Sequence, residues 1–337
     1  MRLAQGTILV ALLTSCGADE QPVASPEPAA DEVESTAEEQ VTTTTVTTTT
    51  TTTPPPPTVT DAVEVAGVAF NGRPVPVVPD TAEALAASFT VVQDGLRAEG
   101  STQEQWADLG HTEQLIIRSL LRQPEWHDTF LAALPEDYAT IAQLHLDART
   151  ELGLLHTGVT PSERVPGWRI VDPVPMEELV AHYQRGGEET GIDWEILAGI
   201  NLVETVMGRI DGVSSAGALG PMQFLPTTWP EVSQGGDVLD PADAIPGAAR
   251  YLVQRGGLDD IRAGLWGYNN SDHYGNAVLA YAEMLQFDER ALRGFYNWEV
   301  YVGSAEGTLW LPVGFDEPEP RNAADYLSEN PWANTLG

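Results

Sequence analysis

Residues 200–208 read INLVETVMG, and the glutamate inside this apolar stretch decides how the rest of the chain is interpreted. Leu197 precedes Glu204 by seven positions, so on a helix both side chains lie on one stripe. A glutamate is rarely fully buried unless another group pairs with it or the protein uses it. The pattern therefore indicates either a buried ion pair with Arg209 or Arg250, or a carboxyl group with a chemical task.

The helix that carries this glutamate is predicted to run from Trp194 to about Met207, with Asp193 as its capping residue and Gly208 at its end. Glu204 then lies in the last turn, where the helix dipole places partial negative charge. Apolar neighbours and this helix end both disfavour the ionised carboxylate. We therefore predict a raised pKa, which would let the carboxylic acid donate a proton near neutral pH.

Two further blocks follow along the chain. Residues 212–229, GVSSAGALGPMQFLPTTW, are rich in glycine and proline, which predicts a constrained loop whose backbone can approach a ligand closely. A G-x-S-x-G nucleophile turn is excluded because its last glycine would fall at Ala216. Residues 264–285 place the polar pair Tyr268 and Asn269 just before a predicted helix.

In this order, the blocks resemble the lytic transglycosylases of bacterial cell walls, whose catalytic domain has a lysozyme-like fold. The likeness covers about residues 174–287 and includes an E-T-x-x-G motif, a G-A-x-G-x-M-Q-F-x-P-x-x-W motif and a Y-N pair. Residues 242–257, ADAIPGAARYLVQRGG, are similar to the family's connecting helix. The matching positions are Glu204, Thr205, Gly208, Ser214, Gly217, Gly220, Met222, Gln223, Phe224, Pro226, Trp229, Tyr268 and Asn269.

The resemblance implies non-hydrolytic cleavage of the β-1,4 bond from N-acetylmuramic acid to N-acetylglucosamine in peptidoglycan, giving 1,6-anhydromuramoyl ends. It implies Glu204 as catalytic acid and then base, with no metal and no cofactor. The tryptophans of the motif blocks, Trp229 and Trp266, fit either sugar stacking or core packing. The residues that the resemblance assigns to substrate binding are Ser214, Met222, Gln223, Tyr268 and Asn269.

Two other functions remain open from the residues. A hydrolytic muramidase would need a second carboxylate to activate water, and Asp211, Asp237 and Asp240 are the candidates. A wall-binding lipoprotein without catalytic activity would need no such group. Neither Ser214 nor Gln223 decides between these functions, because a local role in the loop would explain both side chains.

The amino terminus, MRLAQGTILVALLTSC, has the layout of a secretory signal peptide over residues 1–15. Cys16 is the only cysteine, and Leu-Thr-Ser-Cys resembles the bacterial lipobox, in which this cysteine carries lipid. A plain signal peptide with an unmodified cysteine is the alternative. Residues 16–60 are acidic and rich in Thr and Pro, which predicts a disordered linker. We therefore predict a lipid-anchored protein outside the cytoplasm that faces the bacterial wall.

Composition limits the partners. The 337 residues carry 50 acidic and 16 basic side chains, a net charge of −34, and all 16 basic residues are arginine. The missing lysine excludes a Walker lysine and Schiff-base chemistry. Such an acidic chain repels nucleic acid, which we exclude as a partner. The expected partners are peptidoglycan strands, the membrane through the lipid anchor at Cys16, and proteins of cell-wall growth or division.

The predicted fold is mainly α: a lysozyme-like helical catalytic domain, preceded by a small helical subdomain and followed by a short hairpin-like region. Helical spacing of apolar residues supports the two helical parts, and aromatic and β-branched alternation around Ala305 supports the hairpin. The predicted segments after the linker are an extended stretch (61–80), a helical subdomain (81–157), a second linker (158–173), the catalytic domain (174–287) and a C-terminal extension (288–337).

Overall fold

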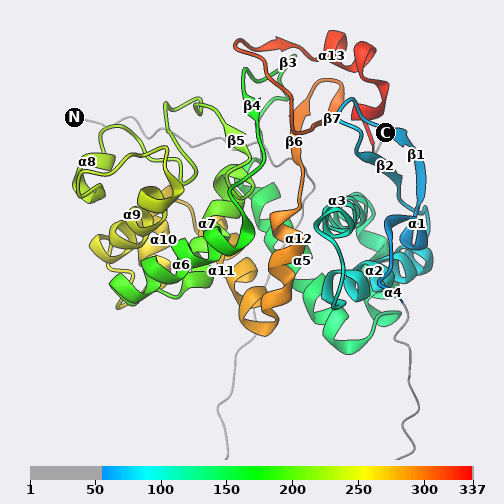
Figure 1. The fold of residues 1–337 in the computed structure, drawn as a ribbon, viewed down its shortest axis with the longest axis horizontal. Coiled ribbons are helices and arrows are strands. Elements are labelled where there is room, and N and C mark those ends of the chain that lie inside the picture. The colour runs from blue at the N-terminus through cyan, green and yellow to red at the C-terminus, as the bar shows by residue number, and fades with distance from the viewer. Residues whose placement is uncertain (1–54, 336–337) are drawn as a thin grey trace, which may run out of the picture. The chain divides into compact units, whose positions relative to one another are not determined.

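A computed structural model describes residues 55–335, which form helices joined by loops and four two-stranded antiparallel ribbons (Figure 1). The prediction of a mainly helical protein is confirmed. The α-helices are α1 (Val59–Ala62), α2 (Ala82–Arg97), α3 (Gln103–Leu120), α4 (His127–Ala132), α5 (Glu136–Leu155), α6 (Met176–Thr190), α7 (Trp194–Thr205), α8 (Trp229–Val232), α9 (Pro241–Gln254), α10 (Ile261–Asn269), α11 (Asp272–Phe287), α12 (Leu292–Tyr296) and α13 (Ala323–Glu329). The strands are β1 (Glu64–Val68), β2 (Pro74–Val77), β3 (Arg164–Val165), β4 (Arg169–Ile170), β5 (Ile210–Asp211), β6 (Val300–Ser304), β7 (Gly307–Leu311) and β8 (Arg321–Asn322).

The helices share one continuous apolar core. Helix α11 packs against both α5 and α7, and α6 packs against α7 and α9. Helix α5 belongs to the predicted helical subdomain, whereas α7 and α11 belong to the predicted catalytic domain. Contacts among the described residues from 56 onward gather them into one compact unit. The two predicted parts therefore bury apolar surface against each other.

Helix α7 lies at the centre of this core. Every residue from Ile196 to Thr205 is buried, as expected for a helix that is apolar on all sides. Asp193 stands at the N-cap position, but its side chain makes no capping hydrogen bond, so the predicted cap is wrong in that detail. The helix ends before Met207, because Val206 and Met207 have φ of 53° and 63°, which is left-handed backbone that no α-helix continues.

The segments that were predicted as a linker and an extended stretch contain short paired strands. Within the predicted linker 158–173, β3 pairs with β8 and β4 pairs with β5. Residues 61–80 contain β1 and β2, which pair with each other. Helix α1 begins at Val59, so regular structure starts inside the segment that was predicted to be a disordered linker. Two-residue strands carry almost no local pattern, which explains why the linker was not predicted to pair.

The predicted C-terminal hairpin is present. Strands β6 and β7 pair from Val300 opposite Leu311 to Ser304 opposite Gly307, joined by the two-residue turn at 305–306. Short connections of this kind are the commonest in hairpins. Residues 1–54, including the predicted signal peptide and Cys16, lie outside the described residues, so those assignments stay predictions. None of the described helices has the length and hydropathy needed to cross a membrane.

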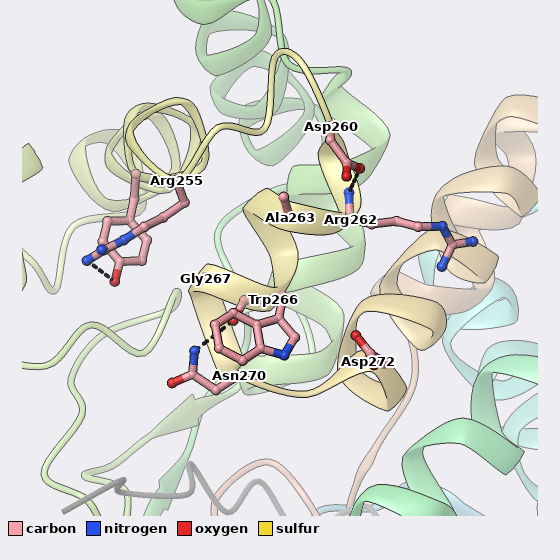
Figure 2. A pocket seen from close by; sticks show the side chains of 9 residues that line it. Arg255, Asp260, Arg262, Ala263, Trp266, Gly267, Asn270 and Asp272 are labelled. Atoms are coloured by element: carbon pink, nitrogen blue, oxygen red, sulfur yellow. Dashed lines mark hydrogen bonds between the residues drawn. The ribbon is translucent and has the colours of Figure 1, made fainter. Parts of the chain in front are cut away.

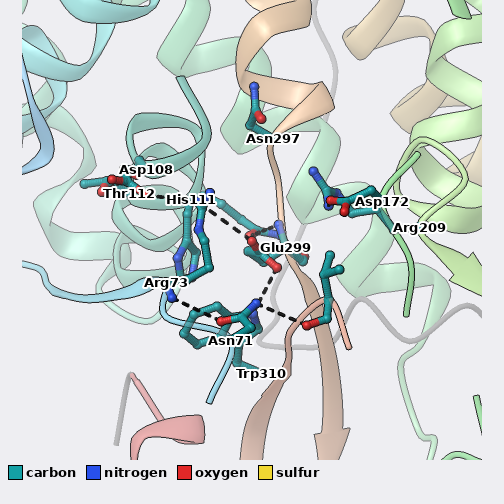
Figure 3. Close-up of polar contacts among 12 residues, drawn as sticks. Asn71, Arg73, Asp108, His111, Thr112, Asp172, Arg209, Asn297, Glu299 and Trp310 are labelled. Carbon is teal, nitrogen blue, oxygen red and sulfur yellow. Dashed lines mark hydrogen bonds and ion pairs between the residues drawn. The ribbon is translucent and has the colours of Figure 1, made fainter. Parts of the chain in front are cut away.

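The first ribbon, β1–β2, is held against the C-terminal region. Between its strands, Arg73 forms an ion pair with Asp108 of α3 at 3.1 Å and lies 3.9 Å from Glu299, just before β6 (Figure 3). On the same ribbon, the ring of Phe70 contacts the ring of Trp332 edge to face, with centroids 5.8 Å apart. Residues from the two ends of the described chain therefore meet.

Candidate active site

Glu204 is the buried carboxyl group at the end of α7. Its side chain is 1 % exposed. Among the described residues, the carboxyl group has one hydrogen-bond partner: Oε1 accepts from the hydroxyl of Tyr274 on α11 at 2.7 Å. Burial raises the pKa of Glu204 to about 8, although the hydrogen bond from Tyr274 lowers it somewhat. The direction agrees with the prediction from the sequence, and the cause is mainly loss of water around the carboxylate.

The predicted alternative of an ion pair at Glu204 is wrong. Arg209 donates to the carbonyl oxygen of Tyr296 at 2.8 Å, and Arg250 pairs with Glu189 at 2.8 Å. Neither guanidinium bonds to Glu204. A buried, unpaired carboxyl group is far less costly when it is protonated, because burying an isolated charge is strongly unfavourable.

The position of the acid proton follows from these contacts. Because the hydroxyl of Tyr274 donates to Oε1 of Glu204, the proton of the neutral acid is favoured on Oε2. Oε2 is closed from solvent and has no hydrogen-bond partner within residues 55–335. Leaving such a group unsatisfied costs about 1–3 kcal/mol. The protein thus holds a buried donor whose acceptor is missing, which is the arrangement expected of a group waiting for a ligand atom.

The loop of residues 212–229 is attached directly to the end of α7. The side chains of Asn201 and Thr205 both donate to the carbonyl oxygen of Pro221, at 2.8 and 2.7 Å. From α10, the hydroxyl of Tyr268 donates to the carbonyl oxygen of Met222 at 2.8 Å. Three segments that the sequence analysis selected separately are therefore joined by buried and half-buried hydrogen bonds.

Stacked tyrosine rings complete the connection. The rings of Tyr268 and Tyr274 are nearly parallel, at 6° with centroids 6.2 Å apart, and Tyr251 of α9 meets Tyr268 edge to face at 5.5 Å. Burial raises the pKa of Tyr268, and the negative charge of Glu204 raises it further. Both tyrosines thus stay neutral hydrogen-bond donors beside Glu204 at any physiological pH.

The other predicted substrate-binding residues serve the loop itself in this structure. Ser214 is buried, and its hydroxyl accepts from the backbone N–H of Ala218 at 3.0 Å. Gln223 is buried and donates to the carbonyl oxygen of Gly220 at 2.9 Å. The side chain of Met222 is buried in the core, and its assignment to substrate binding stays a prediction. Asn269 is half-buried at the end of α10.

Gly220 shows why this loop needs glycine. Its φ is +74°, and a Cβ there would lie 1.9 Å from the carbonyl oxygen of Val238. No other residue fits without moving the backbone. The close approach sets the path of the chain into Met222, whose carbonyl oxygen receives the bond from Tyr268.

A depression of about 710 Å³ lies beside these residues, between α9 and α10 (Figure 2). Trp266 is 49 % exposed on its wall, so core packing is the wrong interpretation for this tryptophan. Arg255 and Asn270 also line it. Tyr251 contacts Tyr268 and lines the same depression, so the aromatic cluster reaches the surface here.

Sequence reasoning assigned no role to Tyr274, the direct partner of Glu204. The available signal was weak: Tyr274 lies four residues before Val278 and seven before Tyr281, on the buried stripe of α11. That spacing marks a core residue and does not show that its hydroxyl meets a carboxyl group. The partner became visible only when α11 was placed against α7.

Comparison of the chain with protein-family models, with curated proteins and with solved structures finds no match. The likeness to lytic transglycosylases therefore depends on the motif residues themselves. The structure adds the arrangement of these residues. Tyr274 donates to Glu204 and stacks against Tyr268, and the hydroxyl of Tyr268 donates to the backbone of Met222.

Proposed function

We propose that the protein is a peptidoglycan lytic transglycosylase whose helical region around α7 is lysozyme-like and whose single catalytic carboxyl group is Glu204. One observation carries the proposal: a buried carboxyl group with a pKa of about 8 and an unpartnered Oε2. Such a group is largely protonated at neutral pH, as a general acid must be. Its ionised form is still accessible, as a general base requires.

The proposed reaction uses one carboxyl group twice. Glu204 gives its Oε2 proton to the glycosidic oxygen as the bond to the muramoyl C1 breaks, while the N-acetyl oxygen of the same sugar stabilises C1. The carboxylate then removes the proton of the C6 hydroxyl, and O6 bonds to C1. Glu204 is returned to its acid form, and the nucleophile comes from the substrate, so no water must be positioned.

The contacts of the candidate second carboxylates support a transglycosylase over the hydrolytic alternative. Asp211 is paired with Arg169, and the carboxylate of Asp240 caps α9 by accepting from Ala242 at 2.8 Å. The carboxylate of Asp237 accepts from the backbone N–H of Leu239 at 2.9 Å. Each predicted second carboxylate therefore has a structural partner. A water-activating base would need a free oxygen facing Glu204.

Substrate access requires a local change. Because Glu204 is 1 % exposed, a neighbouring side chain must shift before a glycosidic oxygen can reach Oε2. Tyr268 is the half-buried member of the stacked tyrosine pair and borders Tyr251 at the surface depression. Catalytic hydrogen bonds are often incomplete in free enzymes and form only with substrate. Lipid anchoring at Cys16 would keep this site near the wall.

The test is digestion of purified peptidoglycan, followed by mass analysis of the released muropeptides. A transglycosylase gives 1,6-anhydro ends, which are one water lighter than the reducing ends left by a muramidase. The matched variant is Glu204→Gln, which keeps the shape of the side chain and removes the acid. Products with reducing ends would support the muramidase instead. If Glu204→Gln digested peptidoglycan as well as wild type, Glu204 would not be the catalytic residue.

A further inference from the structure

A second cavity, of about 490 Å³, is formed by segments distant in the sequence. Its walls come from the end of α5, the connection through β3, the loop after β5 and strand β6. Its volume lies in the range of small-molecule and peptide sites. Glu204 does not line it, and nothing in the proposed reaction uses it.

The walls are mainly apolar. Val159 and Val213 line the cavity although they are 42 % and 56 % exposed, and the half-buried indole of Trp168 lies among them. Val165 and Val302 add fully buried surface. Single exposed apolar side chains are ordinary, but a group that converges on one cavity indicates a binding site.

A buried imidazole lines the same cavity. Nδ1 of His156 lies 2.7 Å from the carbonyl oxygen of Leu152, and a carbonyl only accepts, so Nδ1 carries hydrogen. In the neutral ring, Nε2 is then an acceptor. His156 is 7 % exposed, and its Nε2 is closed from solvent and has no partner in the part of the chain that the structure describes. Buried polar atoms are rarely left unsatisfied, so Nε2 calls for an N–H or O–H donor from a bound molecule.

The cavity also has a positive group. Arg164 is exposed on its wall and donates to the carbonyl oxygen of Pro320. Within residues 55–335, no carboxylate lies at ion-pair distance from Arg164. Other described arginines, such as Arg255 and Arg262, also bond to neutral partners, so the feature specific to Arg164 is its place on the cavity wall. A guanidinium in this state favours a ligand with a carboxylate.

The loop after β5 connects this cavity with the candidate active site. Val213 and Ser215 line the cavity, and the loop continues through residues 219–224 to the carbonyl oxygens bonded by α7 and Tyr268. The indole N–H of Trp168 contacts the carbonyl oxygen of Val213 at 3.4 Å. One loop therefore borders both places, and a ligand in the cavity can belong to the same substrate.

We propose that this cavity binds the peptide that hangs from the peptidoglycan glycan chain. Small apolar side chains of the peptide lie between Val159 and Trp168, a backbone N–H donates to Nε2 of His156, and a peptide carboxylate meets Arg164. The choice of peptide rests on the proposed function, whereas the cavity and its unfilled acceptor do not. An extended peptide spans about 3.3 Å per residue, so a few residues reach well beyond one sugar.

The test has a binding arm and a cleavage arm, both with the full chain. Stem peptides released from wall by an amidase are titrated calorimetrically into wild type, Val159→Glu and Arg164→Gln. Cleavage is compared on intact peptidoglycan strands and on peptide-free strands from the same amidase digestion. Leu239→Glu is the control, since Leu239 is also an exposed apolar side chain, at 58 % against 42 % for Val159, and lies outside the cavity. Ring ¹⁵N signals of His156 report whether Nε2 gains a donor.

We expect wild type and Leu239→Glu to bind the peptides and to show a lower KM on peptide-bearing strands. Val159→Glu should weaken binding at least tenfold and raise that KM towards the peptide-free value, with kcat on peptide-free strands unchanged. Arg164→Gln should do the same only for peptides with a free carboxylate. The His156 signal should shift with peptide in wild type only.

Each contrary outcome has one meaning. Wild type that binds no peptide and does not distinguish the two strand types overturns the proposal, even if it cleaves both. Wild type that binds peptide in the cavity but cleaves neither strand retains this site and overturns the proposed function. A concentration-dependent dimer in ultracentrifugation that Val159→Glu abolishes would assign the cavity to a second copy of the chain, and would also overturn the proposal.

Discussion

The hydroxyl of Tyr274 donates to Oε1 of Glu204 at 2.7 Å, and this single bond links α11 to the end of α7 inside the core. Burial and this hydrogen bond act in opposite directions on the ionisation of Glu204. Burial favours the neutral acid, whereas the tyrosine donor stabilises the carboxylate. The pKa of about 8 is the balance of the two effects, and it permits an acid step and a base step in one cycle.

Removing that donor should shift the balance. Tyr274→Phe deletes the bond that lowers the pKa of Glu204, so we expect the alkaline limb of the kcat/KM profile to move to higher pH. Glu204 is then a weaker acid, because the carboxylate left after proton transfer is less stable, so the acid step should slow and kcat should fall about tenfold at neutral pH. The measurement is the pH–rate profile on purified wall.

Tyr183→Phe is the control for this variant. Tyr183 is equally buried and donates to Asn201 of α7 at 2.6 Å, but it does not touch Glu204. It should lose stability without moving the alkaline limb. If both variants shift the limb alike, the effect comes from general loosening of α7 and not from the bond to Glu204.

Glu204→Gln should reduce cleavage by about 10²–10⁴, the usual loss when a general acid is removed. It should also change how stability depends on pH. The pKa of Glu204 rises from 4.5 in the unfolded chain to about 8 in the fold, so the folded state holds the proton more tightly. Its stabilising contribution is complete below pH 4.5 and is lost as pH rises towards 8.

Wild type should therefore lose a few kcal/mol of unfolding free energy between pH 5 and 9 that Glu204→Gln does not lose, at ~1.4 kcal/mol for each unit of pKa change. Urea unfolding of both proteins across this range measures the difference. Parallel stability curves would mean that Glu204 titrates as an ordinary glutamate, and the proposed acid would lose its physical basis.

Tyr268→Phe tests the bond from α10 to the loop. Loss of the hydroxyl leaves the carbonyl oxygen of Met222 without its donor, at a cost of about 1 kcal/mol in stability. Because this carbonyl fixes the loop beside the end of α7, cleavage should fall more than stability alone explains. Asn269→Ala removes the neighbouring side chain but not this bond. Its stability should match that of wild type in thermal unfolding.

Gly220→Ala should be among the most damaging single changes in the loop. A Cβ at Gly220 would lie 1.9 Å from the carbonyl oxygen of Val238, and the φ of +74° adds backbone strain. We expect a loss of more than about 2 kcal/mol in unfolding free energy together with loss of activity. Gly217→Ala has a similar φ of +82° but open space around the Cβ, so its cost should be about 1 kcal/mol. Equal losses would show that strain, and not the close approach, controls the loop.

How far the sequence predicts this structure depends on the range of each pattern. The burial of Glu204 was visible because an apolar helix repeats every few residues, and the hairpin around Ala305 because its strands are neighbours in sequence. Pairing of β3 with β8 joins residues 164–165 to residues 321–322, which no local pattern records.

The same limit applies within the site. The motif selected Glu204, Tyr268 and Gln223, but it could not show that Tyr274 is the partner of the carboxyl group, because that contact depends on how α11 packs on α7. Nor could it show that the amide of Gln223 is used by the carbonyl oxygen of Gly220. Sequence patterns indicate which residues can carry the chemistry, whereas the packing of the helices determines which of their polar atoms already have hydrogen-bond partners.

The contact of Phe70 with Trp332 affects the order in which parts of the fold can form during translation. The β1–β2 ribbon leaves the ribosome long before Trp332, whose ring contacts the exposed ring of Phe70, has been made. The ring contact that holds Phe70 can therefore form only after translation has passed residue 332. Nascent chains stalled before residue 332 should accordingly be more sensitive to proteases around residue 70 than the released protein.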